Sequence, residues 1–414
     1  MSKIFPSFQV LSIPDFKNFI VGKFLLSFAI RTMHIILGWL IYSHTHNEFH
    51  LGLVGLSEAI PFITLTLYGG HVADITSRRK IVVACSAVYV CIASLQLFFT
   101  HNFEYVYANF GLFPFWLLIG LAGITRAFYA PANGALVAQV VPRSMFVHSA
   151  TLNSLAYDMG SICGPAIAGL LYAYYGHDIA FSFLFVMVIC SLFFMSRISQ
   201  IPLPPKPTHE NIWDSLKQGL KFVFKTQQLI GAFALDMFAV LFGGAIAMLP
   251  AYADKVLHCG PKGLGYLQSA MAIGAVIMSI ILSSRPVRKN AGKKLFLSIA
   301  IFGICILVFA LSKNYILSFV MLMLAGAFDE ISVIIRTTIV QMYSPENMRG
   351  RIEAVSKIFI GSSNELGAFE SGTAARGLGL VPSVVAGACI TLAVVATCFK
   401  FMPKIRNLEF EQNQ

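Results

Sequence analysis

Charged residues are scarce in this sequence: Asp, Glu, Lys and Arg make up 12% of its 414 residues, against 57% hydrophobic residues. Soluble domains carry about 25% charged residues, so a soluble fold would have too little polar surface to cover this apolar excess. A chain embedded in a lipid bilayer needs no such covering. The composition therefore excludes an ordinary soluble domain and predicts an integral membrane protein.

The sequence motifs of several common enzyme classes are missing as well. No G-x-x-x-x-G-K-[ST] segment is present to hold the phosphates of ATP, and neither H-E-x-x-H nor G-x-S-x-G occurs. We therefore expect neither ATP hydrolysis by this chain nor the commonest metalloprotease and hydrolase activities. The prediction is that the protein is not an enzyme and uses no cofactor.

The eight cysteines form neither a disulfide framework nor a metal-ligand pattern. Seven lie inside apolar runs, where a thiol packs as a small apolar side chain, and only Cys259 lies in a loop. The segment HTHNEFH brings His44, His46 and His50 close together, but it is short and lacks cysteine. We interpret these three as solvated histidines of an outer loop and expect no metal site.

Apolar runs dominate the rest of the sequence. A helix needs about 20 residues to cross the hydrocarbon layer, and twelve runs reach that length. The predicted spans are 19–42, 52–73, 80–99, 112–133, 148–174, 178–198, 228–250, 263–283, 294–312, 315–340, 352–377 and 381–402. The first run is too long for the core of a signal peptide, so we expect an uncleaved helix. The fold class predicted is an all-α bundle of twelve transmembrane helices.

The positive charges lie in short loops between the runs. With the N-terminus inside, 22 of the 30 Lys and Arg residues fall in cytoplasmic segments or helix ends and only four fall outside. This bias predicts that both termini are cytoplasmic. The cations do not gather on one face, so the net charge of +11 does not indicate nucleic acid as a partner.

A polar connector divides the spans into six and six. It begins with the proline-rich IPLPPKPTHEN and continues with IWDSLKQGLKFVFK, in which Ile212, Leu216, Leu220 and Phe224 recur at helical spacing. The second segment predicts an amphipathic helix on the inner membrane surface. We therefore expect an N-terminal bundle at 1–200, a cytoplasmic linker at 201–227 and a C-terminal bundle at 228–414.

The two halves contain similar loops. The segments VAQVVPRSMFVHSATL and IVQMYSPENMRGRIEAV both read as a Gln near a helix end, a Pro turn, an Arg and a new helix. They follow the fourth and tenth spans, on the same side of the membrane. Parallel six-helix repeats related by an axis along the membrane normal occur in one large class of secondary transporters.

The segment GGHVADITSRRK, residues 69–80, resembles the signature loop between helices two and three of the major facilitator superfamily. It departs from that pattern at Ser77, where glycine is usual. The resemblance implies a gating latch, which joins the first half to the start of helix eleven near 351–353 when the inner side is closed. The latch residues it implies are Gly70, Asp74, Arg78 and Arg79. We also expect Gly69 and Gly70 to allow close helix contact.

The fifth span contains GSICGPAIAG, with Gly160, Gly164, Pro165 and Gly169. Physically this pattern predicts a kinked helix packed through small residues. The spacing also resembles the fifth-helix motif of exporters in the superfamily, with Ala168 in place of one glycine. The resemblance favours export over uptake.

Three longer segments are similar to one branch of the superfamily. They are LGLVGLSEAIPF, RAFYAPANGALVAQVVP and RTTIVQMYSPENMRGRIEAVSKIFIGSSNELGAFESG. Together with the loop they resemble enterobactin exporters and macrolide-efflux-like proteins, from about Pro14 to Ala396. The resemblance implies a bacterial inner-membrane transporter.

Ionisable residues inside the spans are candidate functional groups, because each is costly in hydrocarbon. Arg126 and Asp158 lie at similar depths and are predicted to share a polar cavity. The alternative for each is a structural ion pair, and Arg336 near the inner end can simply snorkel. Arg31 precedes His34 by almost one turn, and Glu58 precedes a proline. The proton-coupling and cavity candidates are Arg31, Arg126, Asp158, Asp236, Asp329 and Glu365.

The function predicted is secondary active transport by alternating access. We expect a monomer that exports a small organic molecule, a siderophore or a drug, in exchange for protons. One alternative within transport is a lysophospholipid flippase. Another, from a different class, is a membrane receptor or scaffold that does not transport, which has no need of the embedded charges.

Overall fold

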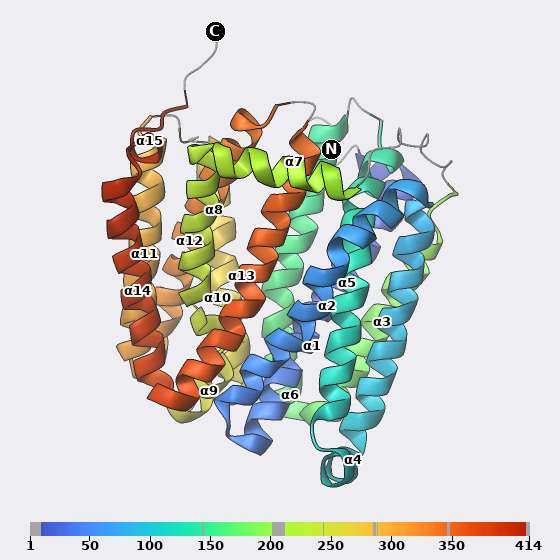
Figure 1. The fold of residues 1–414 in the computed structure, drawn as a ribbon. Helices are drawn as coiled ribbons and strands as arrows, with labels where there is room; N and C mark the ends of the chain where they lie inside the picture. The colour runs from blue at the N-terminus through green and yellow to red at the C-terminus, as the bar shows by residue number, and fades with distance from the viewer. Residues whose placement is uncertain are drawn as a thin grey trace. The chain divides into compact units, whose positions relative to one another are not determined.

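The computed structural model describes residues 10–142, 145–200, 212–242, 244–284, 287, 289–345 and 348–410. All regular elements in these ranges are helices (Figure 1). The first half contains α1 Pro14–Thr45, α2 Glu48–Ile75, α3 Arg78–His101, α4 Phe103–Phe110, α5 Phe113–Val140 and α6 Phe146–Ser196. The second half contains α7 Ile212–Lys225, α8 Gln227–Phe242, the 3-10 turn η3 Gly244–Ile246, α9 Leu249–Lys255, α10 Gly260–Ser284, α11 Ala291–Leu311, α12 Tyr315–Tyr343, α13 Arg349–Leu378, α14 Leu380–Phe401 and α15 Pro403–Arg406.

The helices account for all twelve predicted spans. Nine helices within the described ranges are long and apolar enough to cross a membrane. One of them, α6, runs through the fifth and sixth predicted spans with a break at Gly176, where φ is 79° and ψ is −177°. Glycine adopts positive φ without the steric cost of a Cβ, so this residue lets one span end and the next begin without a loop.

The other two predicted spans depart from a simple apolar helix. The seventh, predicted at 228–250, is not continuous: α8 ends at Phe242 and is followed by η3 and α9. Two consecutive glycines in the sequence lower the helix propensity there, and Pro250 begins the next helix. The eleventh is α13, a helix of 30 residues whose charged side chains lower its hydropathy.

Contacts divide the chain into two compact units. One contains residues up to Ile41 together with Ser57–His209, and the other contains Tyr42–Leu56 together with Glu210–Gln414. The core of the first unit includes Phe16 of α1, Val82 of α3, Leu136 of α5 and Met195 of α6. The core of the second includes Phe233 of α8, Leu295 of α11, Ile335 of α12, Ile352 of α13 and Val395 of α14.

The turn between α1 and α2 groups with the second unit by its contacts. Lys255 Nζ lies 2.6 Å from Glu48 Oε1, and His46 Nδ1 lies 3.6 Å from Asp254 Oδ2. The expected histidine loop is wrong in detail, because only His46 and Asn47 separate the two helices. Among the described residues no group of three potential ligands could hold a metal ion.

The predicted amphipathic segment is helix α7, which crosses α8 and α13 in Figure 1. Its buried side overlaps the expected stripe: Leu220 packs against the core of the second unit beside the fully buried Val223, whereas Phe224 is 62% exposed. The side chains of Ile212 and Leu216 lie outside the described residues. Lys217, Lys221 and Lys225 are exposed. The apolar spacing therefore identified the buried face at Leu220 but not at Phe224.

The two predicted repeat loops have the same backbone turn. Met145 N donates to Pro142 O and Met348 N donates to Pro345 O, each over 2.9 Å, and a helix begins at the next residue in both. The two methionines have closely similar dihedral angles, with φ −109° and ψ 7° at Met145 and φ −120° and ψ −3° at Met348. The sequence similarity of the loops therefore reflects a shared structure.

Candidate functional site

Glycines allow α2 and α5 to pack with their backbones in contact, and this packing positions the first site. A Cβ added to Gly123 would overlap the backbone of Glu58, and one added to Gly69 would overlap that of Ala127. A larger residue at either glycine would force the helices apart. Arg126 follows Gly123 by almost one turn on the same face of α5, so its side chain reaches Glu58.

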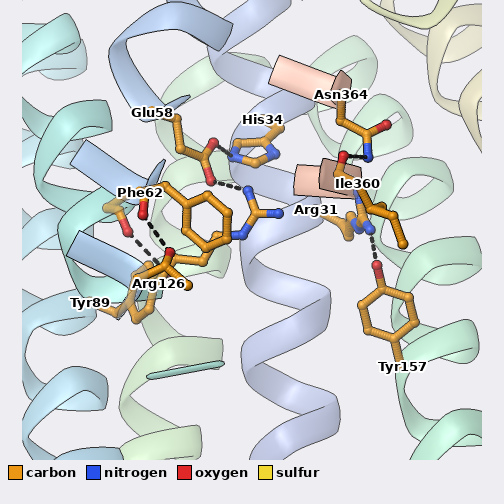
Figure 2. A network of polar contacts seen from close by, with 11 residues as sticks. Arg31, His34, Glu58, Phe62, Tyr89, Arg126, Tyr157, Ile360 and Asn364 are labelled. Atoms are coloured by element: carbon orange, nitrogen blue, oxygen red, sulfur yellow. Dashed lines mark hydrogen bonds and ion pairs between the residues drawn. The ribbon is translucent and has the colours of Figure 1, made fainter. Parts of the chain in front are cut away.

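Figure 2 shows the carboxylate of Glu58 between side chains from two other helices. Arg126 Nη1 donates to Glu58 Oε1 over 2.7 Å, and His34 Nε2 of α1 lies 3.1 Å from Oε2. The Glu58 side chain is 6% exposed, whereas that of Arg126 is 35% exposed. The Arg126 guanidinium also lies over the Phe62 ring, with its carbon 4.5 Å from the ring centre.

This cluster joins a buried carboxylate to one permanent cation and to one imidazole. Arginine stays protonated in proteins, whereas an imidazole binds and releases protons between about pH 5 and 8. A buried carboxylate keeps its charge only while it has partners. Proton binding at His34 or Glu58 would therefore change the attraction between α1, α2 and α5.

Arg31 forms a second contact of the same unit, between α1 and α6. Its Nη2 donates to the Tyr157 hydroxyl, and its guanidinium carbon lies 5.4 Å from the centre of the Tyr157 ring. A Cβ on Gly164 would lie 3.1 Å from that of Arg31, and one on Gly160 would lie 3.1 Å from Phe28 N. The small residues of α6 thus hold its backbone close to α1 at this depth.

The predicted neighbours Arg126 and Asp158 have different partners. Arg126 is paired with Glu58, whereas Asp158 interacts electrostatically with Lys23 of α1. Lys23 Nζ also donates to Asn153 Oδ1 over 2.5 Å. Similar depth in the membrane did not identify the pairs, because depth says nothing about which way a side chain points around its helix.

The second unit has its own ion cluster, with the charges reversed. Arg336 of α12 forms an ion pair with Asp236 of α8, and its Nη2 lies 3.9 Å from Asp329 Oδ1. Arg336 Nε donates to Ser332 O over 3.2 Å. The side chains of Arg336 and Asp236 are 10% and 7% exposed, and that of Asp329 is 43% exposed. The interpretation that Arg336 snorkels to the inner surface is therefore wrong.

The two clusters share one equivalent position of the repeat. Gly326 precedes Asp329 by three residues, as Gly123 precedes Arg126. A Cβ on Gly326 would overlap the O, C and Cα atoms of Met271 in α10. A Cβ on Gly123 would overlap the same three backbone atoms of Glu58. Met271 is therefore the positional counterpart of Glu58, and Asp329 that of Arg126. The remaining candidate, Glu365, lies partly buried in α13.

The latch residues are only partly described. Asp74 lies in α2, but its side chain lies outside the described residues, as do those of Arg351 and Glu353. A Cβ on Gly70 would meet nothing within 4 Å, so the close packing expected of both glycines is confirmed for Gly69 and wrong for Gly70. The latch itself stays a prediction.

Both latch arginines bind backbone carbonyls of the first unit. Arg78 Nη1 donates to Ala135 O over 3.3 Å. Arg79 Nε and Nη2 donate to Ile198 O and Ser196 O over 2.5 and 2.6 Å. The last carbonyls of α6 have no partners within the helix, so Arg79 satisfies them and neutralises the negative end of the helix dipole.

The helix-five motif has the packing role expected from its composition. Gly164, Pro165 and Gly169 are buried in α6. Thr32 of α1 donates its hydroxyl to Gly164 O over 3.2 Å. Pro165 lies inside the helix and supplies no backbone donor there.

The sequence-based candidates omitted three residues of these clusters. Glu58 and His34 stood out as embedded ionisable residues, but they were not joined to Arg126, and Arg336 was interpreted as a helix-end residue. A sequence signal for the Glu58–Arg126 pair is the presence of Gly69 in α2 and Gly123 in α5, because small residues on two helices indicate that their backbones can come into contact. The i, i+7 spacing of Asp329 and Arg336 on α12 is a similar signal.

Comparisons with known proteins agree with this architecture. The family model of the transmembrane secretion effectors, a division of the major facilitator superfamily, matches residues 7–414. The enterobactin exporter EntS of Shigella boydii serotype 18 is 26% identical over 360 residues, covering 83% of this chain and 80% of that protein. EntS of Escherichia coli O1:K1 is 26% identical over 358 residues with the same coverage.

Solved transporter structures have a similar fold. The POT family transporter PepTSo superposes with a TM-score of 0.75 at 12% identity, covering 95% of this chain and 98% of its own. A bacterial homologue of the human lysosomal transporter Spinster superposes with a TM-score of 0.74 at 12% identity, covering both chains fully. Nucleoside transporter NupG has a TM-score of 0.73 at 15% identity, covering 94% of this chain and 99% of its own.

These named relatives and structural neighbours are membrane transporters, not enzymes. The chain therefore belongs to the transmembrane secretion effector family of the major facilitator superfamily, and it is a multi-pass membrane transporter of small molecules.

Proposed function

We propose that this transporter exports a small organic molecule, a siderophore such as enterobactin or a drug, in exchange for protons. The relatives named as enterobactin exporters support a siderophore as cargo. The exporter-like motif of α6 supports the direction. The proposal places the protein in a bacterial inner membrane as a monomer with both termini cytoplasmic, in line with the distribution of Lys and Arg.

The division of the chain into two compact units supports alternating access. In the proposal the N-terminal bundle at 1–200 and the C-terminal bundle at 228–414 rock about a central binding site, and the segment 201–227 links them. Asp74, Arg78 and Arg79 act as the latch that holds the inner side closed. Arg79 makes two short hydrogen bonds at the end of α6, whereas the hydrogen bonds of Arg78 to backbone carbonyls are longer, at 3.3 and 3.4 Å. In the proposal the latch role therefore falls mainly to Asp74 and Arg78.

The observation that carries proton coupling is the buried cluster of Glu58, His34 and Arg126. Three ionisable groups from three helices are costly in a membrane bundle, which supports a functional role. Protonation of the His34–Glu58 pair would weaken the hold of Glu58 on Arg126. The exchange of this proton between the two sides of the membrane would bias the transporter toward the conformation that reloads substrate.

A second proton-binding candidate lies in the second unit. One guanidinium, that of Arg336, serves two carboxylates, and Asp329 is the more distant and the more exposed of them. Asp329 therefore gains least from the cation and is the carboxylate that most easily accepts a proton.

Transport by reconstituted protein tests this proposal. Enterobactin movement would be measured in proteoliposomes with an imposed pH gradient, for the unaltered protein and for Glu58→Gln and Asp158→Asn. We expect Glu58→Gln to abolish the acceleration by the gradient while leaving downhill counterflow intact, because glutamine keeps the shape but binds no proton.

Two results would contradict it. Gradient-driven export that survives in Glu58→Gln but is lost in Asp158→Asn would assign the proton to Asp158 instead. Absence of any enterobactin movement by the unaltered protein would reject this siderophore as the substrate. Arg78→Gln serves as a latch variant and should slow turnover without changing substrate affinity.

A further inference from the structure

Arg31 is the embedded arginine that has no carboxylate partner among the described residues. It lies near the middle of α1, and its recorded contacts are the hydroxyl and the ring of Tyr157. Arg126 and Arg336, by contrast, are each paired with a buried carboxylate. A charge inside a membrane span is costly, and a guanidinium cannot become neutral by losing its proton. The charge of Arg31 therefore needs a counter-ion that the described part of the chain does not supply.

Two acids of the first unit, Asp158 and Glu58, already have partners. Asp158 follows Tyr157 directly, but it interacts electrostatically with Lys23, two turns of α1 away from Arg31. Glu58 is held by Arg126 and His34. Neither acid is therefore available to neutralise Arg31 without breaking an existing pair.

The surroundings of Arg31 carry a net positive charge. His34 follows on the same face of α1, and Figure 2 shows Arg31, His34, Glu58 and Arg126 in one polar network. The guanidiniums of Arg31 and Arg126 are accompanied there by the single carboxylate of Glu58, which Arg126 and His34 already hold. This arrangement attracts anions and repels cations.

The geometry of Arg31 fits a planar oxyanion. A guanidinium has five N–H donors in one plane, and the recorded contacts of Arg31 use one of them, on the Tyr157 hydroxyl. The Tyr157 ring is 45% exposed beside it, so an aromatic surface adjoins the free donors. Gly160 and Gly164 hold α6 against α1 here, which keeps the pair in a defined position.

We propose that Arg31 and Tyr157 bind an anionic oxygen group on a planar part of the transported molecule, a carboxylate or a phenolate attached to an aromatic ring. The guanidinium pairs with the oxygen atoms, and the Tyr157 ring packs against the planar group. The proposal rests on the proposed export function and names the substrate class. It makes the first unit selective for acidic aromatic molecules over cationic ones.

A binding measurement on the full-length purified protein tests this directly. Salicylate is the anionic aromatic probe, and salicylamide is its neutral counterpart of the same shape. We expect calorimetry to detect salicylate binding at neutral pH, with salicylamide weaker by about tenfold, the size expected for one charge-assisted pair. Equal binding of the two probes, or no salicylate binding, would overturn the proposal.

Variants assign the effect to these residues. Arg31→Gln should lower the salicylate affinity about tenfold and leave the salicylamide affinity unchanged, whereas Arg31→Lys should keep part of the preference. Tyr157→Phe keeps the ring but removes the hydroxyl, and should weaken salicylate binding less than Arg31→Gln. A purely structural Arg31 would instead weaken both probes together. The comparison of probes on the unaltered protein stands even if Arg31→Gln does not fold.

Transport separates this inference from the proposed function. An unaltered protein that exports no enterobactin but prefers salicylate through Arg31 would reject the export of that siderophore and uphold the anion site. An unaltered protein that exports it, with Arg31→Gln showing the same KM, would uphold export and overturn the anion site.

Discussion

The two ion clusters share one equivalent position, Arg126 in the first unit and Asp329 in the second, where the charge has the opposite sign. In the first unit one carboxylate, Glu58, is held by a cation and a histidine, and the cation is partly exposed. In the second unit one cation, Arg336, is held by two carboxylates and is almost fully buried. The repeat thus preserves one position of each cluster, while the side chain at that position sets the sign of its charge.

The difference in burial has a physical consequence. Arg126 lies over the Phe62 ring and is 35% exposed, so water can reach it when its partner is lost. Arg336 and Asp236 have no comparable access to water, because their side chains are 10% and 7% exposed. We therefore expect the second cluster to matter more for folding and the first to be freer to change its protonation during transport.

The largest expected effect is the loss of Arg336. Arg336→Met leaves Asp236 buried without its cation, and should lower the free energy of unfolding by about 3–5 kcal/mol, as for other broken buried pairs. Denaturant titration in detergent measures this. Lys289→Met, at an exposed position of the same unit, is the control and should be neutral. If Arg336→Met lowers the free energy of unfolding no more than Lys289→Met does, the second cluster is not the one that matters more for folding.

The next effect concerns the helix packing that places Glu58 opposite Arg126. Gly123→Ala introduces a Cβ against the Glu58 backbone and should cost about 1–3 kcal/mol of stability. It should also impair gradient-driven transport, because α2 and α5 must separate. Gly134→Ala in the same helix is the matched control, since its Cβ would meet nothing within 4 Å. That substitution should be neutral or stabilising by about 0.5–1 kcal/mol.

Equal destabilisation by Gly123→Ala and Gly134→Ala would indicate that the loss of stability does not come from contact between α5 and α2. A stable Gly123→Ala protein with normal transport would show that the close approach is unnecessary for the cluster.

The smallest effect is expected at the end of α6. Arg79→Gln removes charged donors from the carbonyls of Ser196 and Ile198, and should lower the free energy of unfolding by about 1 kcal/mol. Lys80→Gln, at the exposed neighbouring position, is the control for the loss of one positive charge. If both variants lose the same stability, the positive charge of the loop contributes to stability and the hydrogen bonds of Arg79 to the two carbonyls do not.

Much of the fold could be predicted because it depends on local properties of the sequence. Apolar runs long enough to cross a bilayer identify the spans, and the Pro-containing loops identify the repeat. The break of α6 at Gly176 also falls between the predicted fifth and sixth spans. The interruption after α8 was missed, since a run of apolar residues looks the same whether its helix is continuous or not.

The candidate site was harder to predict than the fold. Arg126 and Asp158 lie at similar depths, yet Arg126 pairs with Glu58 and Asp158 interacts with Lys23. A pair across a bundle depends on helix rotation and on which helices touch, and neither follows from the position of a charge along its own span. The same limit applies to α7, whose buried residue Val223 lies beside the predicted apolar stripe.

The sequence alone determined that this chain spans a membrane as a helical protein with two similar halves, and that it carries charges inside those spans. Low charge content and long apolar runs leave few other stable arrangements in water or lipid. Only the tertiary structure decided which charges meet. The backbones of α2 and α5 approach closely enough, through Gly69 and Gly123, for Glu58 to reach Arg126, and that approach is a property of two helices together.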